Sequence, residues 1–286
     1  MNDLVATLLN ALTSISILML VAIGLSVVYG LMNVMNLAHG SFVTVGAYTL
    51  AATQALGGSF WLALLIAPVI GYALGVLVEG LLIRRLYHRP IAVILATWGL
   101  GLVMQQSIQF AFGAAPRSVG APFAEAVELF GMTYPAYRLF LIGTAILIVV
   151  ACGLLLRFTN VGLDIRAVIQ NREMAESLGI NTARVYRRAF GFGTALAAVA
   201  GVLLAPLSVV IAQMGVNYLA RSFLVVLVGG AGSIVGVAAG SGVVGGLETL
   251  FSHELPVAVA QALVLAITAV LMRFRPNGLI ALGGGR

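Results

Sequence analysis

Polar side chains interrupt an otherwise apolar stretch between Gly30 and Ser41. Amide, imidazole and hydroxyl groups at this spacing can hydrogen-bond a small polar solute. The free N–H groups that begin the next apolar run, 42–56, form a partial positive pole suited to a carboxylate. The same groups can also do no more than cap a break in a helix and satisfy its backbone. The candidate solute-contacting residues in this segment are Asn33, Asn36, His39, Gly40, Ser41 and Thr44.

Two further segments carry polar groups among apolar residues. On the run 91–113, Thr97, Gln105 and Gln109 follow one another at i, i+8 and i+12 and so share one face of a helix. That face either lines a polar path or supplies hydrogen bonds between helices. A second break, at Ala231-Gly232-Ser233, adds Gly232 and Ser233 to the candidate path, whereas most of the glycines beyond it are expected to serve close helix packing.

The most polar stretch of the chain runs from Phe158 to Arg188. Within it, Glu173-Met-Ala175 followed by Gly179 matches the EAA-x-x-x-G pattern of ABC-importer permeases at all but one position. A short helix ending in a glycine turn can dock in a groove on a partner protein. The alternative is an ordinary amphipathic surface helix. The residues expected to make the docking contact are Arg166, Arg172, Glu173, Ala175, Leu178, Gly179 and Ile180.

Several kinds of chemistry are not expected of this chain. It contains no lysine, which excludes the phosphate-binding loop of an ATPase. The three histidines, His39, His88 and His253, are scattered, and Cys152 is alone, so neither a metal site nor a catalytic acid–base pair is indicated. We expect Glu79 and Glu248, near the ends of apolar runs, to pair with arginines.

The composition requires these groups to lie in a membrane protein. Of 286 residues, 61% are hydrophobic and 8% are charged, far fewer than the roughly 25% of a soluble domain. Long apolar runs at about 5–31, 60–86, 91–113, 138–157, 188–212 and 255–274 are each long enough to cross a bilayer. Shorter runs lie at 42–56, 218–230 and 234–250. We therefore predict a single all-α polytopic domain, 1–286, with eight or nine membrane helices, some of them short or broken; the first is expected to be a spanning helix rather than a cleaved signal.

The arginines predict the orientation. Twelve of them follow the runs 60–86 and 138–157 or end the chain, and by the positive-inside rule they mark the cytoplasmic face. This placement explains the net charge of +6 without a nucleic-acid partner. The N-terminus, the 114–137 loop and the turn at His253 are then expected outside, and the C-terminus inside.

An internal repeat is suggested by a pattern that occurs twice. In each copy a Gly-Ser break precedes a short helix and then a long helix that ends in arginine and proline. The breaks are His39-Gly40-Ser41 and Ala231-Gly232-Ser233, and the copies end at Pro90 and Pro276. Broken segments at corresponding positions of two repeats indicate a transport site, although glycine-rich helices can also match by chance.

Taken together, Asn36-Leu-Ala-His-Gly-Ser41, the 166–181 loop, Leu227-Val-Gly-Gly-Ala-Gly-Ser233 and Arg275-Pro-Asn-Gly-Leu279 resemble the LivH-like permeases of branched-chain amino acid ABC importers. The stretches Leu95–Leu100 and Gln170–Ala175 also resemble the urea-type branch. This resemblance implies a bacterial inner-membrane complex of two permease chains, often different ones, with two ATP-binding subunits and a periplasmic binding protein. It implies that ATP and Mg²⁺ are bound by the partners, with segment 158–188 as the coupling loop.

The expected function is thus import of branched-chain or other hydrophobic amino acids, with urea or short amides as the alternative substrate. An amino acid needs partners for both its carboxylate and its ammonium group, whereas urea needs only neutral ones, and the candidate path is neutral. An ATPase-independent carrier or channel is less consistent with the sequence, because the centres of the apolar runs are nearly free of charge. A membrane enzyme would need reactive groups that are not apparent.

Overall fold

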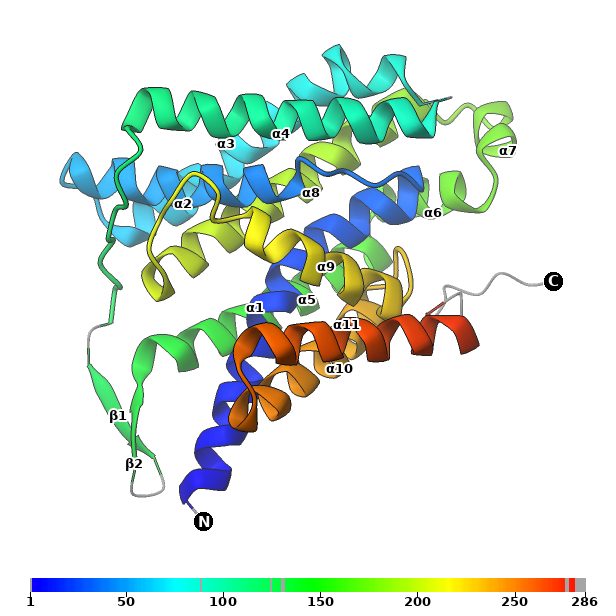
Figure 1. Ribbon diagram of the computed structural model, residues 1–286. Coiled ribbons are helices and arrows are strands. Elements are labelled where there is room, and N and C mark those ends of the chain that lie inside the picture. Colours follow the sequence, from blue (N-terminus) through cyan, green and yellow to red (C-terminus); the bar gives the residue numbers. More distant parts are fainter. Residues whose placement is uncertain (1, 88, 124, 130–131, 276–277, 281–286) are drawn as a thin grey trace.

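The computed structural model describes residues 2–87, 89–123, 125–129, 132–275 and 278–280 as a bundle of helices with one small hairpin (Figure 1). His88, named above among the scattered histidines, Pro276 and Asn277 of the last sequence motif, and Arg286, one of the twelve arginines assigned to the cytoplasmic face, lie outside the described residues. The helices and strands are α1 (Asn2–Met32), α2 (His39–Ala55), α3 (Phe60–Leu81), α4 (Pro90–Phe112), β1 (Ala126–Leu129), β2 (Met132–Pro135), α5 (Ala136–Phe158), α6 (Asn160–Gln170), α7 (Arg172–Ser177), α8 (Thr182–Leu204), α9 (Val216–Gly229), α10 (Ile234–Glu254) and α11 (Val257–Phe274), with 3-10 turns η1 (Ile83–Arg85) and η2 (Ala205–Leu207).

The helix lengths suit a membrane. Within the described residues, seven helices are long and apolar enough to cross a bilayer: α1, α3, α4, α5, α8, α10 and α11. The apolar α9 has 14 residues and α2 has 17, so both are short for a full crossing. The prediction of an all-α polytopic protein with eight or nine membrane elements, some of them short, is confirmed.

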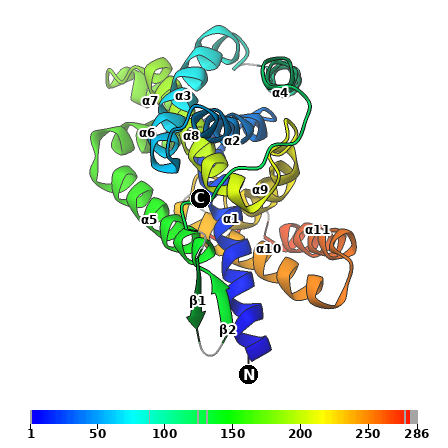
Figure 2. The same ribbon diagram turned by 90° about the vertical axis from the view of Figure 1, so that its left-hand side faces the viewer.

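Helices α1 and α8 cross at the centre of the bundle, and the other helices pack around them (Figures 1 and 2). Glycines allow their backbones to come close: a Cβ atom on Gly46 of α2 would strike the backbone of Ala198 of α8, and one on Gly201 would strike that of Val43. Small residues at helix contacts are the usual means of packing in lipid, where no hydrophobic effect drives helices together. In contrast, α4 lies at the edge of the bundle and contacts α2.

Most of the arginines gather at one end of the bundle, where α3, α5 and α11 finish and α8 begins (Figure 1). We call the described segments 83–87, 89–90, 156–188, 272–275 and 278–280 the basic end. The β1–β2 hairpin, the α2–α3 turn and the α10–α11 turn lie at the opposite end, together with the start of α1. The two groups that the sequence assigned to different faces are therefore separated along the bundle.

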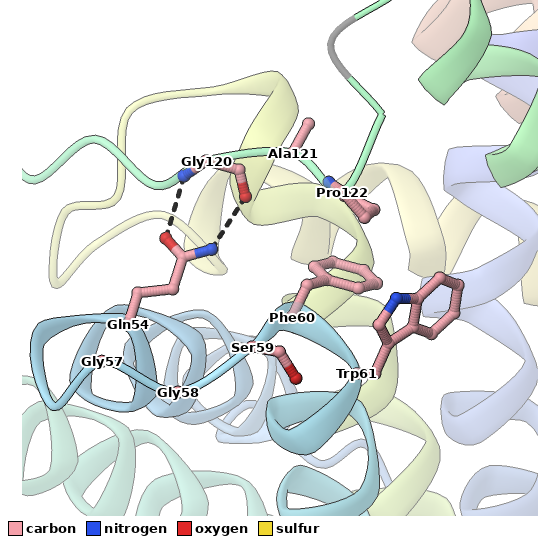
Figure 3. A pocket seen from close by; sticks show the side chains of 9 residues that line it. All are labelled: Gln54, Gly57, Gly58, Ser59, Phe60, Trp61, Gly120, Ala121 and Pro122. Carbon is pink, nitrogen blue, oxygen red and sulfur yellow. Dashed lines mark hydrogen bonds between the residues drawn. The ribbon is translucent and has the colours of Figure 1, made fainter.

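At the opposite end, the segment after α4 is tied across the α2–α3 turn. The side-chain amide of Gln54 accepts from the N–H of Gly120 and donates to its carbonyl, both at 2.9 Å (Figure 3). Arg117 exchanges backbone hydrogen bonds with Val210, which ties the same segment to the chain that follows α8. A shallow hollow of about 500 Å³ lies beside the Gln54 contact, with Phe60 and Trp61 on its wall.

Three elements differ from the sequence prediction. The run 188–212 is not one helix, because α8 starts in the arginine-rich segment at Thr182 and ends before the 3-10 turn that contains Pro206; a proline cannot donate the next helical hydrogen bond. The run 234–250 extends to Glu254 and is long enough to span a bilayer. The 114–137 loop contains the antiparallel hairpin, an addition to the all-helical prediction.

The close contact of α2 with α8 predicts a specific sensitivity. In Gly201→Ala the new methyl group meets the backbone of Val43 and Ala47, and we expect a destabilisation of about 1–3 kcal/mol. The matched control is Gly143→Ala on α5, where a Cβ atom meets nothing within 4 Å. Thermal unfolding of the detergent-solubilised protein should show a lower midpoint for Gly201→Ala alone. Equal midpoints would contradict the packing described here.

Candidate functional site

The break between α1 and α2 is built by its own polar residues. Asn33 takes a left-handed conformation, with φ of 49°, at which the chain leaves α1. The side-chain oxygen of Asn36 accepts from the N–H of Ala38 at 3.1 Å, and the Leu37 N–H donates to the Thr97 hydroxyl at 3.1 Å. Since lipid offers no hydrogen bonds, backbone groups freed at a break must find partners within the protein. Asn36 and Thr97 serve that purpose.

The polar side chains that begin α2 are buried. The Nε2 atom of His39 lies 3.0 Å from the Val21 carbonyl of α1, and the Ser41 hydroxyl donates to the Gly101 carbonyl of α4 at 3.3 Å. Thr44 donates to the Gly40 carbonyl and accepts from the N–H of Gly215 at 3.0 Å. Within this chain these side chains therefore join α2 to α1, to α4 and to the segment before α9, while Asn33 is exposed.

Some hydrogen-bonding capacity in this region is unused. In the part of the chain that the structure describes, three buried atoms have no hydrogen-bond partner: Nδ1 of His39, Nδ2 of Asn36 and Oγ of Ser26. Buried polar atoms without partners are uncommon in native proteins and call for an explanation. Here they belong to the break or to the α1 segment that precedes it, so this is the place where a bound solute or a second conformation has hydrogen bonds to gain.

The second break meets the first. A Cβ atom on Gly30, in the last turn of α1, would collide with the backbone of Gly232. The Ser233 hydroxyl accepts from the Gly236 N–H at 3.0 Å and so caps α10. The segment after α11 also reaches this point, because the N–H groups of Leu279 and Ile280 donate to the carbonyls of Val228 and Gly229 at 2.7 and 3.0 Å. The end of α1, the second break and the segment after α11 thus lie close together near the basic end.

The polar face predicted on α4 is only partly turned to the bundle. Thr97 is fully buried at the first break, whereas Gln105 and Gln109 are half-buried farther along the helix. The structure thus brings Thr97 to the Asn36–Ser41 segment, and it places the two glutamines away from it, toward the opposite end.

The segment 158–188 folds as two short helices before α8 begins. Thr159, Asn171 and Asn181 cap α6, α7 and α8, since each side-chain oxygen accepts from a backbone N–H three residues later. Gly179, with φ of 85°, makes the turn after α7 in a conformation that favours glycine. The sequence prediction of a short helix with a glycine turn agrees with this arrangement.

The face that α7 exposes differs from the one expected. Ala175 is 2% exposed and packs with Ile165 and Val185, and Ile180 is partly buried against the same cluster. Leu178 is 75% exposed and Met174 is 58% exposed. Because a helix turns about 100° per residue, Met174 and Leu178 at i, i+4 lie on one side while Ala175 points inward. The apolar surface available to a partner consists of Met174 and Leu178.

Charged groups hold α7 against the bundle. Arg172 pairs with Glu176 at 3.0 Å, and Glu176 accepts from the Thr182 hydroxyl at 2.7 Å. The hydrogen bonds from Thr182 and Arg172 lower the pKa of the Glu176 carboxyl, and the bond to Glu176 raises the pKa of Arg172. Arg166 instead donates to the carbonyls of Leu156 and Arg157, which joins α6 to the end of α5. Glu173 lies exposed in the first turn of α7.

An aromatic and ionic network continues from α7 into the bundle. The Arg172 guanidinium lies over the Tyr186 ring at 5.6 Å, and that ring stacks on Tyr87 at 4.9 Å. Burial and the adjacent Glu79 carboxylate raise the pKa of Tyr87, so the phenol stays protonated and donates to Glu79 at 2.5 Å. Glu79, whose side chain is 0% exposed, also pairs with Arg187 at 3.2 Å. The predicted arginine pairing of Glu79 is confirmed, whereas Tyr87 and Tyr186 were not singled out in the sequence.

Among the described residues, three arginines lie away from the basic end, and each has a local partner. Arg117 donates to the Phe112 carbonyl at 2.6 Å, and Arg138 donates to the Asn10 side chain at 2.9 Å. Arg221 of α9 pairs with Glu248 of α10 at 2.9 Å, which confirms the predicted arginine pairing of that glutamate. Sequence reasoning did not select Arg221, although an arginine outside the basic segments is itself a signal under the positive-inside rule.

Comparisons with known proteins agree on one family. A family model described as the permease component of the branched-chain amino acid transport system matches residues 7–274. The LivH permease protein of the high-affinity branched-chain amino acid transport system of Salmonella typhimurium is 28% identical over 290 residues, which cover 95% of this chain and 93% of the relative. A probable LivH protein of Methanocaldococcus jannaschii is 29% identical, covering 84% and 78%. The LivM permease protein of S. typhimurium is 26% identical, covering 95% of this chain and 65% of LivM. No solved structure matches the chain significantly.

The pairing of Glu79 with Arg187 predicts how substitutions in the network behave. In Arg187→Met the buried Glu79 carboxylate loses its cation, and we expect a destabilisation of about 2 kcal/mol, less than for a fully buried pair because Arg187 is partly exposed. Arg188→Met, at the exposed neighbouring position, is the control and should be nearly neutral. Adding Glu79→Gln to Arg187→Met should restore most of the loss, since the amide still accepts from Tyr87. Thermal unfolding in detergent measures all three, and a failure of Glu79→Gln to restore stability would contradict the assignment.

Proposed function

The chain belongs to the family of permease components of branched-chain amino acid transport systems, and from this premise we propose how it works in its importer. It is a multi-span permease subunit of an ABC importer. We propose that its single domain, 1–286, lines the translocation path together with a second permease chain. The LivM relative, itself named as a permease of such a system, supports a heterodimer of two related chains.

The basic end is proposed to face the cytoplasm of a bacterial inner membrane. Five arginines lie in the last turn of a membrane helix or just after it at this end, as the positive-inside rule requires: Arg84, Arg85, Arg157, Arg273 and Arg275. The N-terminus and the hairpin then lie in the periplasm. There the shallow hollow beside Gln54 and Trp61 is available to the substrate-binding protein of the importer.

The proposed ATPase contact is the exposed face of α7. The observation that carries this assignment is the pair of exposed apolar side chains, Met174 and Leu178, on a capped helix at the basic end. Arg172 and Gly179 flank this face, and Arg184 is exposed beside it. Apolar anchors surrounded by charge are the usual composition of a docking site for a partner groove. We propose that ATP and Mg²⁺ bind to two partner subunits. This chain has no lysine and therefore no phosphate-binding loop of its own.

Movement of α7 has a physical route into the bundle. Arg172 contacts Tyr186, Tyr186 contacts Tyr87, and Tyr87 donates to Glu79 of α3. Displacement of α7 by the ATPases would act on the ends of α3 and α8, which pack closely on each other. We propose that these two helices convey ATP-driven closure to the breaks at Asn33–Ala38 and Gly230–Ser233.

Branched-chain amino acids are the proposed substrates, in agreement with the family. Urea or a short amide is the second candidate, favoured by the neutral side chains at the first break, Asn33, Asn36, His39 and Ser41. The test is uptake by the reconstituted complex of both permeases, both ATPases and the binding protein. ATP-dependent uptake of leucine with no uptake of urea supports the first candidate, and the reverse result supports the second. Uptake of either solute without ATPase subunits would contradict the importer assignment.

The docking role of α7 predicts the effect of a charge at its turn. Gly179→Asp places a carboxylate on the proposed contact, in open space, and we expect co-purification of the ATPase subunits to fall at least tenfold. Membrane insertion should remain intact. The matched control is Gly113→Asp, because Gly113 also has a positive φ, of 83°, and open space around it, but lies at the opposite end. If both variants retain the ATPases equally, α7 is not the contact.

A further inference from the structure

A polar cavity of about 250 Å³ lies among α1, α9 and α10 near the opposite end of the bundle. Ser14 and Ile17 of α1, Tyr218 and Arg221 of α9 and Glu248 of α10 contribute to its wall. The three helices lie side by side in the view from that end (Figure 2). Pockets for drug-sized ligands measure roughly 300–1,000 Å³, so a cavity of this size suits a small solute.

The wall of this cavity carries a charge pair that is largely shielded from solvent. The side chain of Glu248 is 11% exposed and that of Arg221 is 26% exposed, and they meet at 2.9 Å. Gln261 of α11 also donates to the same glutamate oxygen, Oε1, at 3.1 Å. The guanidinium carbon lies 5.0 Å from the centre of the Tyr218 ring, within the range of a cation–π contact. Ionisable groups within membrane helices are costly and usually serve a function.

Both charged groups keep hydrogen-bonding capacity. An arginine has five N–H donors, and the bonds of Arg221 to Glu248 and to the Asn217 carbonyl use three of them. Both hydrogen bonds recorded for Glu248 within the described residues end on Oε1, which leaves Oε2 as an acceptor. Both charged residues line the cavity, and three hydroxyl-bearing residues line it with them: Ser14, Thr249 and Ser252.

We propose that this cavity is an outward subsite for the zwitterionic head of an α-amino acid. The carboxylate of the solute would bind Arg221 and its ammonium group would bind Glu248, while Ile17 and Leu18 face its side chain. The proposal rests on the proposed function and names the groups that recognise its substrate. It also supplies the charged partners that the neutral break lacks. Urea has no charges to match them and gains only neutral hydrogen bonds here.

The charge pair has a purely structural alternative, in which it only clamps α9 to α10. Ligand analogues separate the two roles without any substitution. In the detergent-solubilised complex of permeases and ATPases, millimolar leucine should raise the thermal unfolding midpoint, because a ligand stabilises the state that it binds. Leucine amide, which lacks the carboxylate, and 4-methylpentanoate, which lacks the ammonium group, should each produce less than a third of the leucine shift. Equal shifts with all three compounds, or none with leucine, would overturn the proposal.

Four variants then locate the effect. Arg221→Gln and Glu248→Gln should each abolish the leucine shift and lower leucine uptake at least tenfold. Arg138→Gln removes another arginine at the same end, outside the cavity, and should leave both unchanged. The double variant Arg221→Glu, Glu248→Arg keeps the attraction between α9 and α10 but reverses the two poles, so it should assemble and still fail to respond to leucine. A normal leucine shift in this double variant would mean that the charge pair only holds α9 to α10, and it would contradict the proposal. Leucine uptake by the unmodified complex reports on the proposed function separately.

Discussion

The need to satisfy backbone groups away from water governs the centre of this protein. Wherever a helix stops inside the bundle, its N–H and carbonyl groups must find partners in the protein itself. Asn36, Thr97 and Ser233 meet that need directly, and Thr44 does so for Gly215. As a result, most of the polar side chains that the sequence suggested as solute contacts already form hydrogen bonds within the protein, and these bonds hold the breaks in place. Gly30 and Gly232 have no side chains, so the backbones of the two breaks can come into contact.

The charged side chains at the two ends of the bundle are arranged differently. At the basic end, arginines lie at the helix ends, and one carboxylate, Glu79, is buried where α3 meets α8. The network through Tyr87 and Tyr186 joins this carboxylate to α7. At the opposite end the arginines are fewer, and each is held by a neighbour. The Arg221–Glu248 pair is exceptional there because it borders a cavity. One end is thus suited to a protein partner and the other to a small solute.

Hydropathy predicted the fold well because lipid imposes a simple rule on helix length. The ends of α4, α5 and α11 fell within two residues of the predicted runs. The turn at Pro206 and the hairpin were missed because local sequence gives weak signals for short 3-10 and strand elements. The functional site was harder to predict than the fold. The pattern around Glu173 located α7 correctly. Whether Ala175 or Leu178 faces outward, however, depends on how α7 packs on α6 and α8. Similarly, Arg221 and Glu248 are 27 residues apart, and only the packing of α9 on α10 brings them together.

The central claim is that α7 lies on the cytoplasmic side, and labelling of single cysteines tests it most directly. Cys152 is buried and is the only native cysteine, so Cys152→Ala gives a background for Leu178→Cys on α7 and Gly57→Cys in the α2–α3 turn. A membrane-impermeant maleimide applied to intact spheroplasts should label the cysteine at position 57. The same maleimide should label the cysteine at position 178 only after the membrane is permeabilised. Labelling of position 178 in intact spheroplasts would place α7 outside and contradict the account.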